Sequence, residues 1–362
     1  MQAAWYANYA VTTVWAASML LECCISSMVM LPEADYRERR EKLNLQDYTF
    51  DGHKDATLGR TPGQVNGQMF VIQNCENCNI YIYDNLSTVT IDDCVNCTIF
   101  MGPIAESVFI RDCKNLKLGI VCQQFRTRDC SKIETFLFCT SQPIIEDSSG
   151  MKFGCFTYFY PELEDQFKAA GMSLFNNNWS KIHDFSQDPS ENHYSYIPED
   201  VKIEDVLPLS LAEQFSAMQI DFSVGKSVVP RTLGLRRKAA DESCLLVFFN
   251  DGSAIDRVRK YMHIMSQNQP SCVLVQTKEI DMQPQDAQRV FGTDAYQSLV
   301  QQGAVIGLEY NGEDSINLCQ VELVEFMKGT TGLVFISQSR ALADKQIEDF
   351  YNFAEMQMTI GE

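Results

Sequence analysis

The stretch Ile72-Gln73-Asn74-Cys75 recurs three times downstream, as Ile91-Asp92-Asp93-Cys94, Ile110-Arg111-Asp112-Cys113 and Thr127-Arg128-Asp129-Cys130. The four cysteines of these repeats are 19, 19 and 17 residues apart. A period of about 20 residues with one strand-like segment per repeat is typical of a solenoid, in which equivalent positions stack between successive coils. The repeats therefore predict a parallel β-helix, and we expect the right-handed form.

Alternation with period 2 assigns the side chains of each repeat to the inside or the outside of the coil. The inward columns lie five and three residues before each cysteine: Phe70, Val89, Val108 and Phe125, then Ile72, Ile91, Ile110 and Thr127. The outward columns are Val71, Thr90, Phe109 and Arg126, then Gln73, Asp92, Arg111 and Arg128. Two residues after the cysteines come Asn77, Asn96 and Asn115, then Lys132. This column suits a corner that needs left-handed backbone or a ladder of side-chain amides.

The same columns decide between a metal site and a packed core. Cys75, Cys78, Cys94 and Cys97 have the C-x2-C-x15-C-x2-C spacing that is usual in structural zinc sites. In the next two coils, however, Leu116 and Ile133 stand in the column of Cys78 and Cys97. Because neither can ligate a metal, we expect a buried ladder of free cysteines, which pack as small apolar residues, and no metal.

The composition indicates a globular protein that does not bind nucleic acid. The chain has 362 residues, 45% of them hydrophobic and 21% charged, and its net charge is −19. Nucleic-acid binding depends on clustered Lys and Arg, so this charge argues against it. The 14 cysteines fall mostly in predicted core columns and strands, which favours a reducing compartment over a disulfide scaffold.

The chain divides into four predicted segments. Residues 1–35 are a divergent N-terminal extension, in which the uncharged run Ala3–Leu21 approaches the length of a membrane span. Residues 36–194 form the β-helix domain, residues 195–243 a linker with a short helix near Ser210–Met218, and residues 244–362 a second domain. No basic residue precedes the uncharged run, so we favour a plain extension over a signal or an anchor.

The second domain alternates predicted strands and helices. The strands are Cys244–Phe249, Cys272–Gln276, Ala304–Tyr310 and Leu333–Ile336. The helices are Ile255–Ser266, Pro284–Phe291, Asp294–Gln302, Ser315–Met327 and Lys345–Met356. This pattern predicts an α/β domain of ferredoxin-like type.

The stretch Cys122-Gln123-Gln124-Phe125-Arg126, which follows the cysteine-lined coils, resembles the tubulin-cofactor-C-type domain. Together with a nucleoside-diphosphate-kinase-like C-terminal domain, it resembles the retinitis pigmentosa 2 family. The stretches that agree closely are Cys75–Ile82, Gln142–Glu146 and Lys152–Phe156. The resemblance runs from about Tyr36 to the C-terminus.

The resemblance implies a GTPase-activating protein for a small Arf-like GTPase, acting in the delivery of lipidated cargo to the ciliary membrane. It makes Arg126 the arginine finger and Gln123 its catalytic companion. The nucleotide-facing residues are then Gln123, Gln124, Phe125, Arg126 and Ser107, and the partner-binding residues are Glu146, Phe185 and Phe109. GTP and Mg²⁺ belong to the partner GTPase, and the chain has no cofactor of its own. In related proteins the motif also acts on tubulin, which is a second candidate partner.

Elementary chemistry partly supports Arg126 as the arginine finger. A guanidinium keeps its charge and presents several donors in one plane, so it can neutralise charge that builds on a phosphate. The outward column of Arg126 is otherwise apolar, which suits a partner surface. Three alternatives stay open. Arg126 could pair with Asp92 or Asp112 as an ordinary surface arginine, and the chain could be a non-catalytic adaptor that binds the GTP-loaded GTPase. On a continuous strand, moreover, Gln124 rather than Gln123 shares a face with Arg126.

The kinase-like domain is predicted to be inactive. A nucleoside diphosphate kinase needs a nucleophilic histidine. Of the four histidines only His263 lies in this domain, in the middle of a predicted helix rather than on a glycine-rich loop.

The N-terminus departs from the family, which begins Met-Gly-Cys and carries two acyl chains. Position 2 is Gln2, so this start does not support N-myristoylation, but Cys23-Cys24-Ile25-Ser26 resembles the segment that normally follows the glycine. We expect residues 1–22 to come from an alternative first exon or a faulty gene model, and we take Cys23 and Cys24 as the candidate sites of palmitoylation. The predicted location is the cytoplasmic face of the plasma and ciliary membranes and the base of the cilium, or the cytoplasm if the chain is unacylated.

Overall fold

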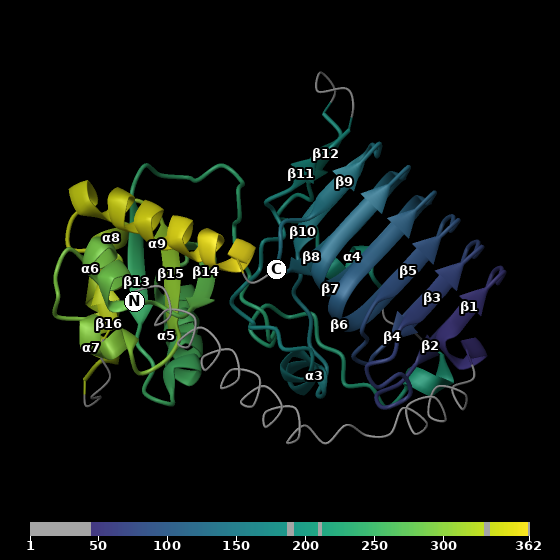
Figure 1. Cartoon of the computed structure of the whole chain (residues 1–362), viewed down its shortest axis with the longest axis horizontal. Helices are drawn as coiled ribbons and strands as arrows, with labels where there is room; N and C mark the ends of the chain where they lie inside the picture. Colours follow the sequence, from purple (N-terminus) through teal and green to yellow (C-terminus); the bar gives the residue numbers. More distant parts are fainter. Residues whose placement is uncertain (1–44, 187–191, 209–211, 329–333, 361–362) are drawn as a thin grey trace, which may run out of the picture. The chain divides into compact units, whose positions relative to one another are not determined.

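The first part of the chain winds into a β-helix whose parallel strands lie side by side as a ladder (Figure 1). The computed structural model describes residues 45–186, 192–208, 212–328 and 334–360, and residues 48–362 form one compact unit. The strands are β1 Thr49–Asp51, β2 Thr57–Arg60, β3 Phe70–Gln73, β4 Asn79–Ile82, β5 Val89–Asp92, β6 Thr98–Arg111, β7 Lys114–Arg128, β8 Ser131–Cys139, β9 Ile144–Glu146, β10 Met151–Cys155, β11 His183–Asp184 and β12 Tyr194–Tyr196. Short helices α3 (Leu163–Ala169) and α4 (Ile203–Val206) and 3-10 turns at Leu45–Tyr48 and Glu213–Phe215 complete this part.

The register between coils confirms the predicted columns. Phe70 pairs with Val89, Val89 with Val108 and Val108 with Phe125, and all four side chains are fully buried. The outward column keeps the same register, so that Val71, Thr90, Phe109 and Arg126 stand in one row across β3, β5, β6 and β7. The predicted β-helix is therefore confirmed, with its inward faces as the alternation assigned them.

The cysteines form part of the packed interior. Each cysteine of the four repeats donates its thiol hydrogen to the carbonyl oxygen two residues earlier, over sulfur–oxygen distances of 3.1–3.4 Å. Cys78 and Cys97 do the same at 3.3 Å. None of the described cysteines is in a disulfide, and the described residues hold no group of three or more His, Cys, Asp or Glu side chains placed to bind a metal.

Left-handed corners turn each coil twice. Asn77, Asn96 and Asn115 have φ of 55° to 56°, and Lys132 follows at 57°. Their amides also stack, because Asn96 Nδ2 donates to Asn77 Oδ1 at 3.1 Å and Asn115 Nδ2 donates to Asn96 Oδ1 at 2.8 Å. The residues directly before the repeat cysteines are left-handed as well: Asn74, Asp93, Asp112 and Asp129. Asn and Asp tolerate this backbone better than other residues with a Cβ, which explains their recurrence.

A second face of the coil is covered by later segments. Tyr81, Phe100 and Phe136 point out of this face and are buried in an aromatic cluster. Phe100 stacks on Tyr158 with ring centroids 4.3 Å apart, and Tyr81 meets Phe215 edge-on at 5.6 Å. Gly59 is required here, since a Cβ would lie 2.1 Å from the carbonyl oxygen of Tyr81. The face that carries Phe109 and Arg126 keeps its side chains accessible.

The C-terminal domain has the predicted ferredoxin-like arrangement. Its strands are β13 Ser243–Phe248, β14 Val273–Ile280, β15 Val305–Asn311 and β16 Val334–Ile336, and they pair antiparallel in the order β14-β15-β13-β16. Its helices are α5 Ala254–Asn268, α6 Pro284–Phe291, α7 Gln297–Val300, α8 Ser315–Phe326 and α9 Arg340–Ile360. Two predicted helices are shorter in the structure. Residues 294–302 hold only the turn α7, and the described part of Ser210–Met218 holds only the 3-10 turn Glu213–Phe215.

The edge of the C-terminal sheet is hydrogen-bonded to segments of the β-helix domain and the linker. Thr277 Oγ1 on β14 donates to the Phe175 carbonyl at 2.7 Å, and Asn176 exchanges two hydrogen bonds with the Glu279 backbone. Lys278, which is 1% exposed, donates to Asn178 Oδ1 at 2.7 Å. Burial, together with the charge of the neighbouring Lys181, lowers the pKa of Lys278 to about 7, although the nearby Glu355 opposes the shift.

Several expectations fall on residues outside the described ranges. These include the uncharged run Ala3–Leu21 and the predicted acylation sites Cys23 and Cys24. Among the described helices none has the length and apolar character needed to cross a membrane. The domain boundaries after residues 35, 194 and 243 stay predictions.

The first prediction concerns the amide ladder. Asn96→Ala should lower the free energy of unfolding by about 1 to 2 kcal/mol, because alanine is strained in left-handed backbone and two amide hydrogen bonds are lost. Asn96→Gly avoids the strain and should lose less, by about 0.5 to 1 kcal/mol. Urea unfolding of both variants measures the difference. Equal losses would show that backbone strain contributes nothing at this corner.

The second prediction concerns Lys278. The unfolded lysine titrates near pH 10.4, whereas the folded one has a pKa of about 7, so between these values only the unfolded chain holds the proton. Wild-type stability should therefore rise with pH in this window, by about 1 to 2 kcal/mol between pH 7 and 8.5 from this residue. In Lys278→Met this contribution should vanish. Urea unfolding of both proteins at the two pH values tests this, and parallel stability curves would contradict it.

Candidate functional site

The outward row that contains Arg126 forms the centre of the candidate site. Arg126 is exposed on β7, and its strand neighbours in the row are Phe109 on β6 and Ile144 on β9, with His183 on β11 beyond. Phe109 is 36% exposed. The row thus places a guanidinium between apolar side chains on paired strands, which limits its freedom to move.

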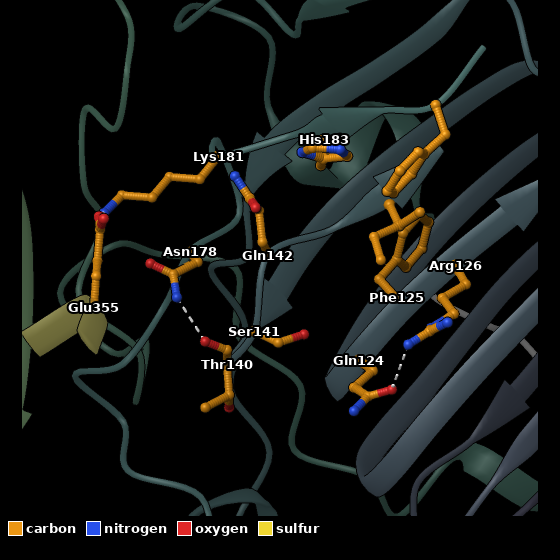
Figure 2. A pocket seen from close by; sticks show the side chains of 12 residues that line it. Gln124, Phe125, Arg126, Thr140, Ser141, Gln142, Asn178, Lys181, His183 and Glu355 are labelled. Atoms are coloured by element: carbon orange, nitrogen blue, oxygen red, sulfur yellow. Dashed lines mark hydrogen bonds and ion pairs between the residues drawn. The ribbon is translucent and has the colours of Figure 1, made fainter. Parts of the chain in front are cut away.

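Arg126 differs from the other arginines of this face in its partners. Arg111 makes a two-pronged ion pair with Asp92, with nitrogen–oxygen distances of 2.9 and 2.7 Å, and Arg128 approaches Asp129 at 3.4 Å. Arg126 has no ion pair with any described residue. Among the residues that the structure describes, its Nη2 donates to the neutral Oε1 of Gln124, at 3.3 Å (Figure 2). The expected alternative of a pair with Asp92 or Asp112 is therefore not formed.

Gln124 rather than Gln123 shares the face of Arg126. Ser107 Oγ donates to the same Gln124 oxygen at 3.0 Å, so Ser107, Gln124 and Arg126 form one chain of hydrogen bonds. Cys122 and Phe125 both point into the core, and the chain turns a corner in the two residues between them. Gln123 is half-buried there, and its carbonyl accepts a hydrogen bond from the Ser141 amide at 2.9 Å.

A cavity of about 340 Å³ opens beside Arg126. Figure 2 shows its side chains, with Arg126, Gln124 and Phe125 at one end and Lys181 and Glu355 at the other. The remaining lining residues are Thr140, Ser141, Gln142, Ile144, Asn178, His183 and Phe185. Lys181 and Glu355 form an ion pair, so Arg126 is the guanidinium left without a carboxylate among the residues that line this space, beside several amides and hydroxyls. This end of the cavity suits an anionic or strongly polar group of a partner.

The predicted partner-binding residues lie around this cavity. Phe185 is 57% exposed and lines it, with its ring 4.2 Å from the ring of His183. Asp184, between these two residues, accepts a hydrogen bond at 2.8 Å from the buried His193, which holds the short strand in place. Glu146 is exposed at the end of β9 and pairs in register with Arg128, one row away from Arg126.

The far end of the cavity was not found by sequence reasoning. Asn178 is 7% exposed, and its Nδ2 donates to the Thr140 carbonyl at 2.6 Å. Lys181 forms an ion pair with Glu355 of α9. The available signal was the run Asn176-Asn177-Asn178, since three successive amides in a loop indicate backbone groups that need partners.

The histidine of the C-terminal domain lies away from this cavity. His263 is exposed on α5, and its backbone carbonyl accepts a hydrogen bond from Ser266 at 2.7 Å. It does not belong to the residues that line the cavity at Arg126. Its position on a regular helix agrees with the expectation from sequence.

Comparison with known proteins places these features in a family. A family model described as tubulin binding cofactor C matches residues 67–185, a range that includes the Arg126 row. Tubulin-specific chaperone C from Homo sapiens is 29% identical over 154 residues, covering 42% of this chain and 44% of its own. Protein XRP2 is 51% identical in Gallus gallus over 323 residues, covering 89% of both chains. In Homo sapiens it is 50% identical over 325 residues, covering 89% of this chain and 92% of its own. With this identity over nearly its whole length, and with a cofactor-C-type β-helix followed by an α/β domain, the chain belongs to the XRP2 family.

Proposed function

We propose that the chain is a GTPase-activating protein for a small Arf-like GTPase and that Arg126 is the arginine finger it supplies in trans. The observation that carries the proposal is the state of Arg126. It is an exposed guanidinium on a rigid strand, with no ion pair to any described residue, beside a polar cavity. An uncompensated cation on a face whose other arginines are paired is available to a partner's charge.

The proposed reaction takes place in the partner's nucleotide site. GTP hydrolysis builds negative charge on the γ-phosphoryl oxygens and on the bridging oxygen. A guanidinium that enters the site can donate to both, which is worth about 10³- to 10⁵-fold in rate, or about 4 to 7 kcal/mol of barrier. The partner holds GTP and Mg²⁺ and supplies the attacking water. Arg126 contributes charge and hydrogen-bond donors, and it exchanges no proton.

Gln124 and Ser107 are proposed to orient this guanidinium. The 3.3 Å contact from Arg126 Nη2 to Gln124 Oε1 fixes the direction of the side chain without neutralising it. Ser107 holds the same oxygen at 3.0 Å and thereby fixes the amide. Gln123 stays the residue that the family resemblance implies, and it would have to act from the corner where its backbone meets Ser141.

Apolar side chains around Arg126 are proposed as the docking surface. Phe109 lies beside Arg126 on the neighbouring strand, and Phe185 stands at the rim of the cavity. Exposed aromatic side chains are frequent anchors in protein interfaces, and they exclude water from charged contacts near them. Glu146 would contact the partner at the edge of this surface. We place this activity in the delivery of lipidated cargo to the ciliary membrane, with acyl chains at Cys23 or Cys24 as the anchor.

A second candidate is activation of tubulin GTP hydrolysis. It is favoured by the family match over residues 67–185 and by the similarity to tubulin-specific chaperone C. The same arginine would act in the same way on a different GTP-binding partner. The proposal assigns the C-terminal domain no kinase activity; in support, its histidine His263 lies on the helix α5 and not on a glycine-rich loop.

The third prediction tests Arg126 directly. In single-turnover GTP hydrolysis by an Arf-like GTPase, Arg126→Ala should reduce the acceleration by about 10³-fold or more. Arg126→Lys should restore little of it, because an ammonium lacks the planar fork. Arg128→Ala is the matched control, since Arg128 is also exposed, lies two residues away on the same strand and approaches Asp129. It should stay within about threefold of wild type.

Two other results would distinguish the GTPase activator from a non-catalytic adaptor and from an activator of tubulin. If wild type binds the GTP-loaded GTPase without accelerating hydrolysis, the chain is an adaptor and the proposal fails. If wild type accelerates GTP hydrolysis by tubulin but not by the Arf-like GTPase, and Arg126→Ala abolishes that acceleration, the partner is tubulin.

A further inference from the structure

Three consecutive asparagines connect the C-terminal sheet to the β-helix. The Asn176 side-chain amide exchanges two hydrogen bonds with the backbone of Glu279 on β14, at 3.0 and 2.8 Å. Asn177 Oδ1 accepts from the Cys139 amide at 3.0 Å, and its Nδ2 donates to the Leu137 carbonyl at 3.3 Å. Asn178 reaches both sides, because its Oδ1 accepts from Lys278 at 2.7 Å and its Nδ2 donates to the Thr140 carbonyl at 2.6 Å.

On the β-helix side, this connection ends at residues 140–142, which we call the wall of the Arg126 cavity. Strand β8 ends at Cys139, and the next residues, Thr140, Ser141 and Gln142, line the cavity. The wall is also tied to β7, since the Ser141 amide donates to the Gln123 carbonyl at 2.9 Å. Asn178 therefore touches the backbone of a segment whose side chains face the proposed partner.

We propose that Asn178 is a positioning residue. By accepting a hydrogen bond from Lys278 and donating one to Thr140, it lets the C-terminal domain hold the wall, residues 140–142, in place. We call this connection the brace. What the wall binds rests on the proposed function, but the bracing itself does not. In this role the C-terminal domain supports the site mechanically and needs no catalytic activity. It also gives a use to Lys278, a buried lysine that the arginine mechanism leaves unexplained.

Burial strengthens this connection. Asn178 is 7% exposed and Lys278 1% exposed, so water cannot easily replace either partner. A hydrogen bond in such buried surroundings is stronger than an exposed one, and its acceptor is held correspondingly firmly. Lys181 and Glu355, the ion pair at the same end of the cavity, are the charged neighbours of Lys278. The brace thus joins β14 and the end of the cavity in one network.

Hydrogen exchange in the full-length chain tests the brace without any GTPase. In Asn178→Ala and in Lys278→Met, the amides of Cys139, Ser141 and residue 178 should exchange about tenfold faster than in wild type. Thr277→Val is the matched control. It removes a buried hydrogen bond of the same interface, from Oγ1 to the Phe175 carbonyl, that does not touch the wall. It should leave these three amides within about twofold of wild type.

Three outcomes would overturn the brace. Unchanged exchange in both Asn178→Ala and Lys278→Met would show that the wall does not depend on these bonds. A change in Asn178→Ala alone would confine the role of Asn178 to the β-helix. Equal acceleration in Thr277→Val would show general loosening of the interface.

GTP hydrolysis at varied chain concentration tests the link to the partner. Asn178→Ala should raise the concentration for half-maximal acceleration about fivefold or more and leave the limiting rate within about twofold, because Arg126 and Gln124 stay on β7. A changed exchange rate with an unchanged half-maximal concentration would refute the link to partner binding. Failure of wild type to accelerate hydrolysis would refute the proposed function, while the exchange experiment would still decide the brace.

Discussion

The parallel register between coils is the constraint on which the site depends. Once Val108 and Phe125 stack inside the coil, the next residues, Phe109 and Arg126, must stand side by side outside it. Shifting the register by one residue would exchange the two faces and bury the arginine. A backbone paired on both sides also holds Arg126 between Phe109 and Ile144. The position of the proposed finger is therefore a consequence of core packing.

The charge of Arg126 stays uncompensated because the side chain that it contacts, Gln124, is neutral. One row away, Asp92 holds Arg111 through two hydrogen bonds, and such a pair would be a poor donor to a new partner. Gln124 has nearly the same shape as a glutamate but no charge, so it orients Arg126 without neutralising it. A glutamate at this position would compete with a phosphate for the guanidinium. The amide thus preserves the electrostatic attraction that a partner's anion would feel.

Sequence patterns predicted the geometry of the β-helix well, because they report on periodic structure. Alternation placed Phe109 and Arg126 outside, as observed. The family resemblance favoured Gln123 as the companion of Arg126 and alternation offered Gln124 as the alternative; in the structure Gln124 contacts Arg126. The corner asparagines and the four strands of the second domain were likewise predictable from period and composition. The far end of the cavity was not. Asn178, Lys181 and Glu355 come from an irregular segment and a distant helix, and only tertiary packing brings them together.

The amide column at the coil corners has a chemical consequence for the lifetime of the protein. Asn96 donates to Asn77 and accepts from Asn115, so each amide depends on the one before it. Spontaneous hydrolysis of the Asn96 side chain would replace its NH₂ group with a carboxylate oxygen. That oxygen would face the carbonyl oxygen of Asn77 and turn an attraction into a repulsion. Ageing by deamidation would therefore weaken the stacking of the coils that hold the arginine row in place.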